Sequence, residues 1–357
     1  MLKTNIKKLP NSEIEIEGEL EAEAFESFYH KALKKIGETV ELDGFRKGKA
    51  PENVLLSHVQ ELHILEEMAQ MALGEHYPKI VEENKIDVIS RPEISITKLE
   101  RNSPLGFKIK TSVMPEVKLP DYKSLAKDIT SKITDAEKNI VVTDEDVENT
   151  IMDIRKSRAP KKHVSEKVHE HKEDEEHTHE EPKEDELPAF NDEFVQQLGP
   201  FENVEDFKEK LKINIKLEKE NQQKEKTRLK IVEKIIDETE IDMPEVLVEA
   251  ELDKILFRME SDITQMGLKF EDYLKHLNKS VEDLRKDFRG DAEKKAKLGL
   301  VLNKLSEVEK IEADPEQVEK EVAHLIEHYK DADPERATLH AQNVLINEKV
   351  FQFLETQ

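Results

Sequence analysis

The spacing of hydrophobic residues near the N-terminus changes from the period of a strand to that of a helix. Ile14, Ile16 and Leu20 alternate with glutamates, which predicts a half-buried strand. Apolar residues then follow helical spacing over residues 22–36 and again from Val54 to Ala72.

Two further strands are expected at residues 94–99 and 107–113, on either side of a turn that contains Asn102, Pro104 and Gly106. This mixture of strands and helices predicts a compact α+β domain over residues 1–115.

Beyond Pro115 the hydrophobic pattern is helical. Thr143 and Asp146 have the spacing of a capping box, in which side chains satisfy the free N–H groups of a new helix. We count five or more amphipathic helices in residues 187–357 and find no strand pattern there. Further helix starts are expected at Asn203, Pro244, Ser280, Asp314 and Asp333. The sequence therefore predicts an elongated all-α C-terminal domain after the α+β domain, and a chain that is mostly helical.

Residues 160–186 interrupt the helical pattern with a low-complexity tract. It contains 11 acids, 5 lysines and 5 histidines but only two aliphatic residues, Val164 and Val168. Such a composition buries too little apolar surface to offset the entropy of ordering, so we expect a disordered linker over 159–186. Residues 116–158 would then form a connection and the first part of the C-terminal body.

The composition excludes several classes of protein. A net charge of −25 repels nucleic acid at long range, so any RNA contact must come from a local basic patch. The absence of cysteine excludes disulfides and zinc–thiolate sites. We expect a soluble cytoplasmic protein, because the first residues lack the apolar core of a secretory signal and no stretch is long enough for a membrane helix. The missing signal also argues against a periplasmic location.

The sharpest local feature is the segment Gly44-Phe45-Arg46-Lys47-Gly48-Lys49-Ala50-Pro51. An apolar ring beside clustered cations suits a docking tip, since cations bind phosphate and the ring packs on a protein or a base. The alternative of equal weight is an ordinary surface turn. A nucleotide-binding P-loop is excluded, because the glycine spacing is one residue short and Ala50 replaces the hydroxyl residue.

The histidines and carboxylates do not form a catalytic pattern. His169, His171, His177 and His179 are spaced for Zn²⁺ or Ni²⁺, but a solvated tether is the simpler explanation for the tract. The remaining histidines show neither a triad nor an HExxH motif. We therefore expect no catalytic residue, no metal site and no cofactor.

Apolar stripes on the C-terminal helices are candidate surfaces for contact with other polypeptide chains, which we call clients. The simpler explanation of each stripe is helix–helix packing. A thin helical domain cannot bury every stripe, however, and exposed apolar patches mark interaction surfaces. The candidate client-binding residues are Leu252, Ile255, Met259, Met266, Val344 and Phe351.

The chain resembles trigger factor, a family of ribosome-associated bacterial chaperones. The 44–51 segment matches the family signature Gly-Phe-Arg-x-Gly-Lys-x-Pro, and three other stretches look like family landmarks. They are Thr143–Val147 with Ile154-Arg155, Leu187–Gly199 and Ile241–Leu247.

The resemblance implies a ribosome-docking N-terminal domain and a helical, SurA-like C-terminal chaperone domain with arms. Docking beside the nascent-chain exit, on ribosomal protein and RNA, would use Gly44, Phe45, Arg46, Lys47, Gly48 and Lys49. The partners implied are the ribosome and unfolded or nascent polypeptides, and a homodimer off the ribosome is left open. No ATP, metal, membrane or DNA is implied.

The chain departs from the family where an FKBP-like prolyl isomerase domain is usual. Residues 160–186 contain no glycine and no aromatic residue, which that domain needs for its strands and its pocket. We therefore expect an ATP-independent chaperone that is not an enzyme. The alternatives are a chain with the family's peptidyl-prolyl isomerase activity and a metal buffer built on the histidine-rich tract.

Overall fold

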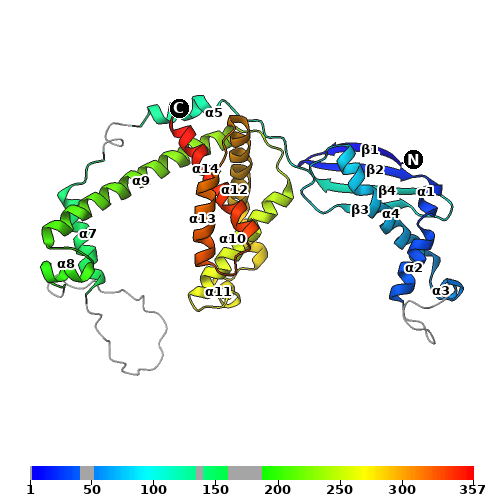
Figure 1. Ribbon diagram of the computed structural model, residues 1–357, viewed down its shortest axis with the longest axis horizontal. Helices are drawn as coiled ribbons and strands as arrows, with labels where there is room; N and C mark the ends of the chain where they lie inside the picture. Colours follow the sequence, from blue (N-terminus) through cyan, green and yellow to red (C-terminus); the bar gives the residue numbers. More distant parts are fainter. Residues whose placement is uncertain (1, 41–51, 134–139, 160–186) are drawn as a thin grey trace, which may run out of the picture. The chain divides into compact units, whose positions relative to one another are not determined.

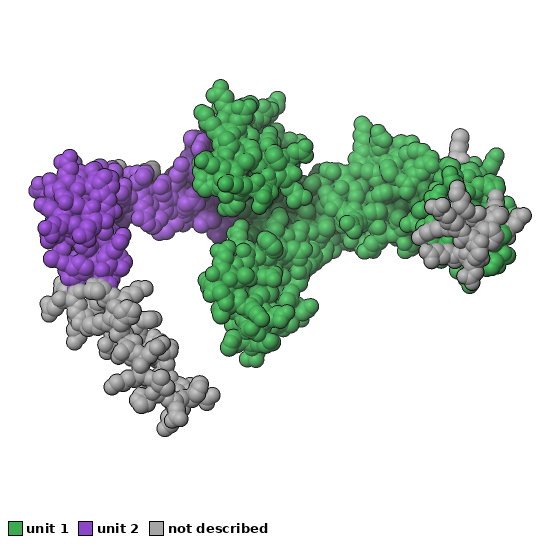
Figure 2. Space-filling view, turned by 60° about the horizontal axis from the view of Figure 1, so that its bottom comes forward, with its two compact units in different colours: residues 1–120, 235–350 green, residues 121–234, 351–357 purple. Residues whose placement is uncertain are grey.

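The computed structural model describes residues 2–40, 52–133, 140–159 and 187–357. It divides the chain into two compact units, each built from segments distant in sequence. Unit 1 contains residues 1–120 and 235–350, and unit 2 contains residues 121–234 and 351–357 (Figure 2). We describe each unit separately.

Unit 1 begins with a four-stranded antiparallel sheet of order β1-β2-β4-β3. The strands are β1 (Leu2–Leu9), β2 (Glu13–Leu20), β3 (Glu93–Lys98) and β4 (Leu105–Ser112) (Figure 1). The central pair aligns Ile16 with Ile109 and Gly18 with Phe107, so their side chains share one face of the sheet. That face forms the core.

The core face requires a glycine in β2. A Cβ atom built on Gly18 would lie 2.2 Å from Cζ of Phe107, so only a residue without a side chain lets this ring cross the strand. Phe107, Ile16 and Ile109 are almost completely buried as a result. We therefore assign Gly18 to packing and not to function.

The opposite face of the sheet is charged and open to solvent. Lys108 and Lys7 bond to the carboxylate of Glu17, with Nζ–Oε distances of 2.5 and 2.9 Å. These two cations lower the pKa of Glu17 to about 2. This face is a solvated charge ladder, typical of an antiparallel sheet covered on one side only.

Four helices belong to this part of unit 1. They are α1 (Ala22–Glu26), α2 (Tyr29–Thr39), α3 (Glu52–His58) and α4 (Glu61–Glu83). The first, second and fourth of them supply buried residues to the core, and the third contacts the second. Phe25, Leu33, Ile36, Met68 and Leu73 are buried against the sheet. The predicted helical run over 22–36 is thus two helices.

The second part of unit 1 is entirely helical apart from one isolated bridge between Lys118 and Glu240. It contains α10 (Glu245–Gln265), α11 (Phe270–Leu277), α12 (Val281–Glu309), α13 (Pro315–His328) and α14 (Pro334–Glu355), of which α14 continues into unit 2. Ser280, a predicted helix start, forms a capping box with Asp283, whose amide donates to Ser280 Oγ at 3.2 Å. Asp314 caps α13 without a capping box, because its carboxylate accepts a single hydrogen bond from the Glu316 amide at 3.0 Å.

Unit 2 contains α5 (Tyr122–Ser131), α7 (Asp144–Ser157), α8 (Asp192–Leu198) and most of α9 (Val204–Glu238). The predicted capping box at Thr143 is present, and Lys219 together with Thr143 lowers the pKa of Asp146 to about 2. One apolar cluster joins α7, α8 and the start of α9. Its buried members are Val142, Val147, Ile151, Phe194, Val195, Phe207 and Ile215.

The chain on one side of the 160–186 tract bonds directly to the chain on the other side. Arg155 Nε donates to the backbone oxygen of Pro188 at 2.8 Å, and α7 and α8 share the apolar cluster. The histidine-rich tract itself lies outside the described residues. Its two flanks therefore leave and re-enter the fold at one place.

The fold class is confirmed: a small N-terminal antiparallel sheet with helices precedes a helical part. The strand β1 was not predicted. Its residues Lys3, Thr4, Asn5, Lys7 and Lys8 are polar and mostly exposed, so no hydrophobic alternation signals it. Pairing with β2 along its whole length forms the strand instead.

Candidate functional site

The predicted docking tip lies outside the described residues. Gly44, Phe45, Arg46, Lys47, Gly48 and Lys49 have no structural description, so their role remains a prediction. Among the described residues, the exposed apolar side chains of the helical parts are the candidates for a binding surface.

The clearest surface of this kind belongs to an arm of unit 1 formed by α10, α11 and α12. Helices α10 and α12 lie side by side and antiparallel, with α11 at the turn between them (Figure 1). Val248, Leu252 and Ala292 are buried between the two long helices, and Met243, Ile255 and Phe288 pack around them. The apolar stripe of α10 therefore holds the arm together.

Ion pairs fix the register of the two long helices. Arg289 donates to both carboxylate oxygens of Glu245, at 2.6 and 2.5 Å, and Arg285 pairs with Glu249 and Asp253. The Arg289 guanidinium lowers the pKa of the Glu245 carboxyl, and Glu249 raises the pKa of Arg285. These charged contacts line the arm beside its narrow core and leave its apolar end uncovered.

The free end of the arm exposes four large apolar side chains, which we call the arm tip: Met266, Leu268, Leu277 and Val281. Met266 is 76 % exposed and Leu268 is 56 % exposed. Helix α11 between them is strongly amphipathic, yet none of its residues is buried. Gly267 turns the chain between Met266 and Leu268 with φ +79°, a conformation that suits glycine. An apolar surface left open in this way is a candidate interaction surface.

The structure separates the six predicted client-binding residues into three groups by their exposure. Leu252 is 1 % exposed and belongs to the arm core, so it offers no surface to another chain. Met266 and Val344 are exposed, and Val344 lies on α14. The other three, Ile255, Met259 and Phe351, are half-buried.

Three of the four residues of the arm tip were not predicted from the sequence. Leu268, Leu277 and Val281 do not fall on a long helical stripe. Leu268 lies between α10 and α11, Leu277 is the last residue of α11, and Val281 is the first residue of α12. The signal that was available is the short amphipathic run Phe270–Leu277 between Gly267 and the capping residue Ser280. A helix of that length has an apolar face but few neighbours to cover it.

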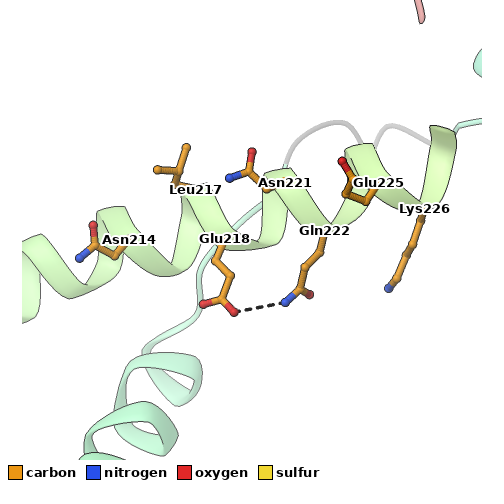
Figure 3. Close-up of a pocket in the computed structure, with 7 residues that line it drawn as sticks. All are labelled: Asn214, Leu217, Glu218, Asn221, Gln222, Glu225 and Lys226. Carbon is orange, nitrogen blue, oxygen red and sulfur yellow. Dashed lines mark hydrogen bonds between the residues drawn. The ribbon is translucent and has the colours of Figure 1, made fainter. Parts of the chain in front are cut away.

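A shallow groove of about 640 Å³ runs along α9 in unit 2. Figure 3 shows its lining residues, which include the exposed Leu217 and a hydrogen bond from Gln222 to Glu218 of 3.3 Å. All seven come from one helix, and none is buried. The groove is an open helix face and lacks the enclosed, convergent polar groups of an active site.

Two other kinds of site are not found in the described parts of the chain. No group of three or more histidine or acidic side chains is placed to hold a metal ion there. None of the described helices is long and apolar enough to cross a membrane.

Comparison with known proteins gives the family. The family model described as "Bacterial trigger factor protein (TF)" matches residues 2–154, and the model of the trigger factor C-terminus matches residues 203–354. The chain belongs to the trigger factor family. The resemblance expected from the 44–51 signature is thus confirmed.

Similar proteins agree with this assignment along the whole chain. A trigger factor from Carboxydothermus hydrogenoformans is 28 % identical, with 99 % of this chain and 98 % of the relative covered. One from Clostridium tetani is 24 % identical over the same shares. A solved structure described as "Promiscuous Substrate Recognition in Folding and Assembly Activities of the Trigger Factor Chaperone" shares the fold, with a TM-score of 0.54, 20 % identity and 99 % of both chains covered.

This member of the trigger factor family lacks residues that its relative has. The alignment to the Carboxydothermus protein runs over 422 positions, at least 65 more than the 357 residues of this chain. The two family matches leave residues 155–202 between them. That gap contains the 160–186 tract and fits the absence of the isomerase domain.

Proposed function

We propose that this protein is an ATP-independent chaperone of the cytoplasm that docks at the ribosomal exit tunnel and shields unfolded polypeptide. Membership of the trigger factor family supports the general role. The observation that carries the proposal is the arm tip, where Met266 and Leu268 are exposed beside an amphipathic helix with no buried residue.

Shielding requires reversible contact with many different sequences. Apolar side chains meet this need because their attraction is non-directional and proportional to the area removed from water. Methionine adds adaptability, since its unbranched thioether fills irregular gaps. A client that folds withdraws its apolar residues from the surface, and the contact is lost without ATP.

Docking raises the strength of these weak contacts. The 44–51 segment, with Phe45, Arg46 and Lys47, would hold the chaperone near the tunnel exit. Segments of the nascent chain that emerge there are at high effective concentration. The cations would meet RNA phosphate, and the aromatic ring would pack on protein or base. A local cluster of cations at residues 46–49 agrees with a net charge of −25, because the chain as a whole repels RNA.

We further propose that the chain has no prolyl isomerase activity. The flanks of the 160–186 tract close on each other through the Arg155–Pro188 bond and one apolar cluster, so unit 2 has its core without an inserted domain. The tract has no glycine or aromatic residue from which a strand scaffold and a proline pocket could be built.

A client whose refolding is limited by proline isomerisation tests both parts of the proposal. Without ATP, the protein is expected to raise the yield of soluble client and to leave the rate constant of the slow phase unchanged. Uncatalysed isomerisation takes about 10–100 s at 25 °C, so the slow phase is easily resolved. An authentic prolyl isomerase serves as the positive control. Faster isomerisation with this chain present would contradict the second part, and an unchanged yield would contradict the first.

A further inference from the structure

Two histidines lie together in the last turns of α13. His324 and His328 are four residues apart on the same side of the helix, and their ring centroids are 4.3 Å apart with a 41° angle between the planes. Both residues are exposed to solvent. Imidazoles at this helical spacing are the usual pair of ligands for a divalent transition metal.

A hydrogen bond determines which nitrogen of the neutral His328 ring carries the hydrogen. Nδ1 of His328 lies 2.9 Å from the backbone oxygen of His324. A carbonyl oxygen only accepts, so Nδ1 of His328 must donate. The neutral ring then carries its hydrogen on Nδ1 and keeps the lone pair on Nε2. Metal-bound histidines typically show this arrangement, because the bond fixes both the tautomer and the ring orientation.

The surroundings favour a cation as well. Within the described residues the His324 ring makes no hydrogen bond or ion pair, so its nitrogens are available to bind a metal ion. Helix α13 ends at His328, and the C-terminal end of a helix carries partial negative charge. Glu327 adds a carboxylate next to His328 in sequence.

The sequence His324-Leu-Ile-Glu-His328 also has the order H-x-x-E-H of the inverzincin peptidases. Such a site needs a third protein ligand, and the described chain contains no group of three that could hold a metal. The spacing therefore indicates binding of a metal ion by two protein ligands, with water at the other positions, and not peptide hydrolysis.

We propose that His324 and His328 form a Zn²⁺-binding site on α13, ligated through Nε2 of His328 and a ring nitrogen of His324. This site uses none of the histidines of the 160–186 tract and does not depend on the chaperone role. Two joined ligands bind more tightly than either alone, because the second contact is intramolecular.

Site-resolved chemical footprinting on the full chain tests the proposal. Diethyl pyrocarbonate modifies accessible neutral imidazoles, and peptide mass spectrometry measures each histidine separately from those of the tract. With increasing Zn²⁺ we expect His324 and His328 to become protected together, at one half-protecting concentration. In His328→Ala that concentration for His324 is expected to rise about tenfold or more, since the chelate is lost.

His340→Ala provides the matched control, because it removes an exposed histidine of the neighbouring helix α14. It should leave the protection of His324 unchanged. His328→Gln, with circular dichroism to follow helix content, separates loss of ligation from loss of the fold. The proposal is overturned if His324 is protected equally well in both His328 variants, or if neither histidine is protected up to about 1 mM Zn²⁺.

Discussion

Replacing Phe45, Arg46 and Lys47 together with alanine is expected to abolish co-sedimentation with ribosomes. The substitution removes the apolar ring and two of the cations of the 44–49 loop at once. Elsewhere the chain is strongly acidic, so no other surface would compensate by electrostatic attraction to RNA. Pelleting of wild type and variant through a sucrose cushion, followed by immunoblotting, measures the effect.

Salt dependence gives an independent signature of the same contact. If two or three cations meet RNA phosphates, wild-type binding should weaken about tenfold between 50 and 200 mM salt, taking the single-strand slope as a guide. The matched control replaces two exposed cations of the same domain, Lys34 and Arg91, with alanine. Equal loss of binding in this control, or wild-type binding in the loop variant, would refute docking through the loop.

The second large effect is expected at the arm tip. Changing Met266, Leu268 and Leu277 to serine should weaken the suppression of aggregation by roughly ten- to a hundredfold in the concentration required, at about 1 kcal/mol per partly covered side chain. The three side chains are 76, 56 and 44 % exposed, so their replacement should leave the fold of the arm intact. Light scattering of a diluted, denatured client without ATP provides the measurement.

The control for the arm tip changes three exposed polar residues of the same arm, Arg258, Asp262 and Lys269, to serine. It alters as many positions but leaves the apolar surface, so full activity is expected. Leu252 is unsuitable as a test residue, because it is buried in the arm core and its replacement would destabilise the arm. Full activity of the arm-tip variant would show that clients bind elsewhere.

The helix starts were predictable because their signals are local. Thr143 with Asp146 and Ser280 with Asp283 form capping boxes through side chains three residues apart, and no distant contact is needed. The strand β2 was predictable for the same reason, since its alternation of Ile14 and Ile16 with glutamates is read directly from neighbouring residues.

The exposed surface was not predictable in this way. Leu252 and Met266 both continue the apolar pattern of α10, but α12 covers the first and nothing described covers the second. Burial depends on which helix packs alongside, and hydrophobic spacing alone does not contain that information. The His324–His328 pair is inconspicuous in the sequence for a different reason, because its order H-x-x-E-H is the reverse of the common zinc motif HExxH.

Photo-cross-linking to a stalled nascent chain tests the central claim most directly. A photoreactive residue replaces Met266 in the arm tip, or Arg258 on the same arm as control, and each protein is added to ribosomes that carry an unfolded nascent chain. The account predicts a strong adduct from position 266, little from 258, and loss of the 266 adduct when Phe45, Arg46 and Lys47 are alanine. Equal adducts from both positions, or an adduct that survives the loop substitution, would contradict it.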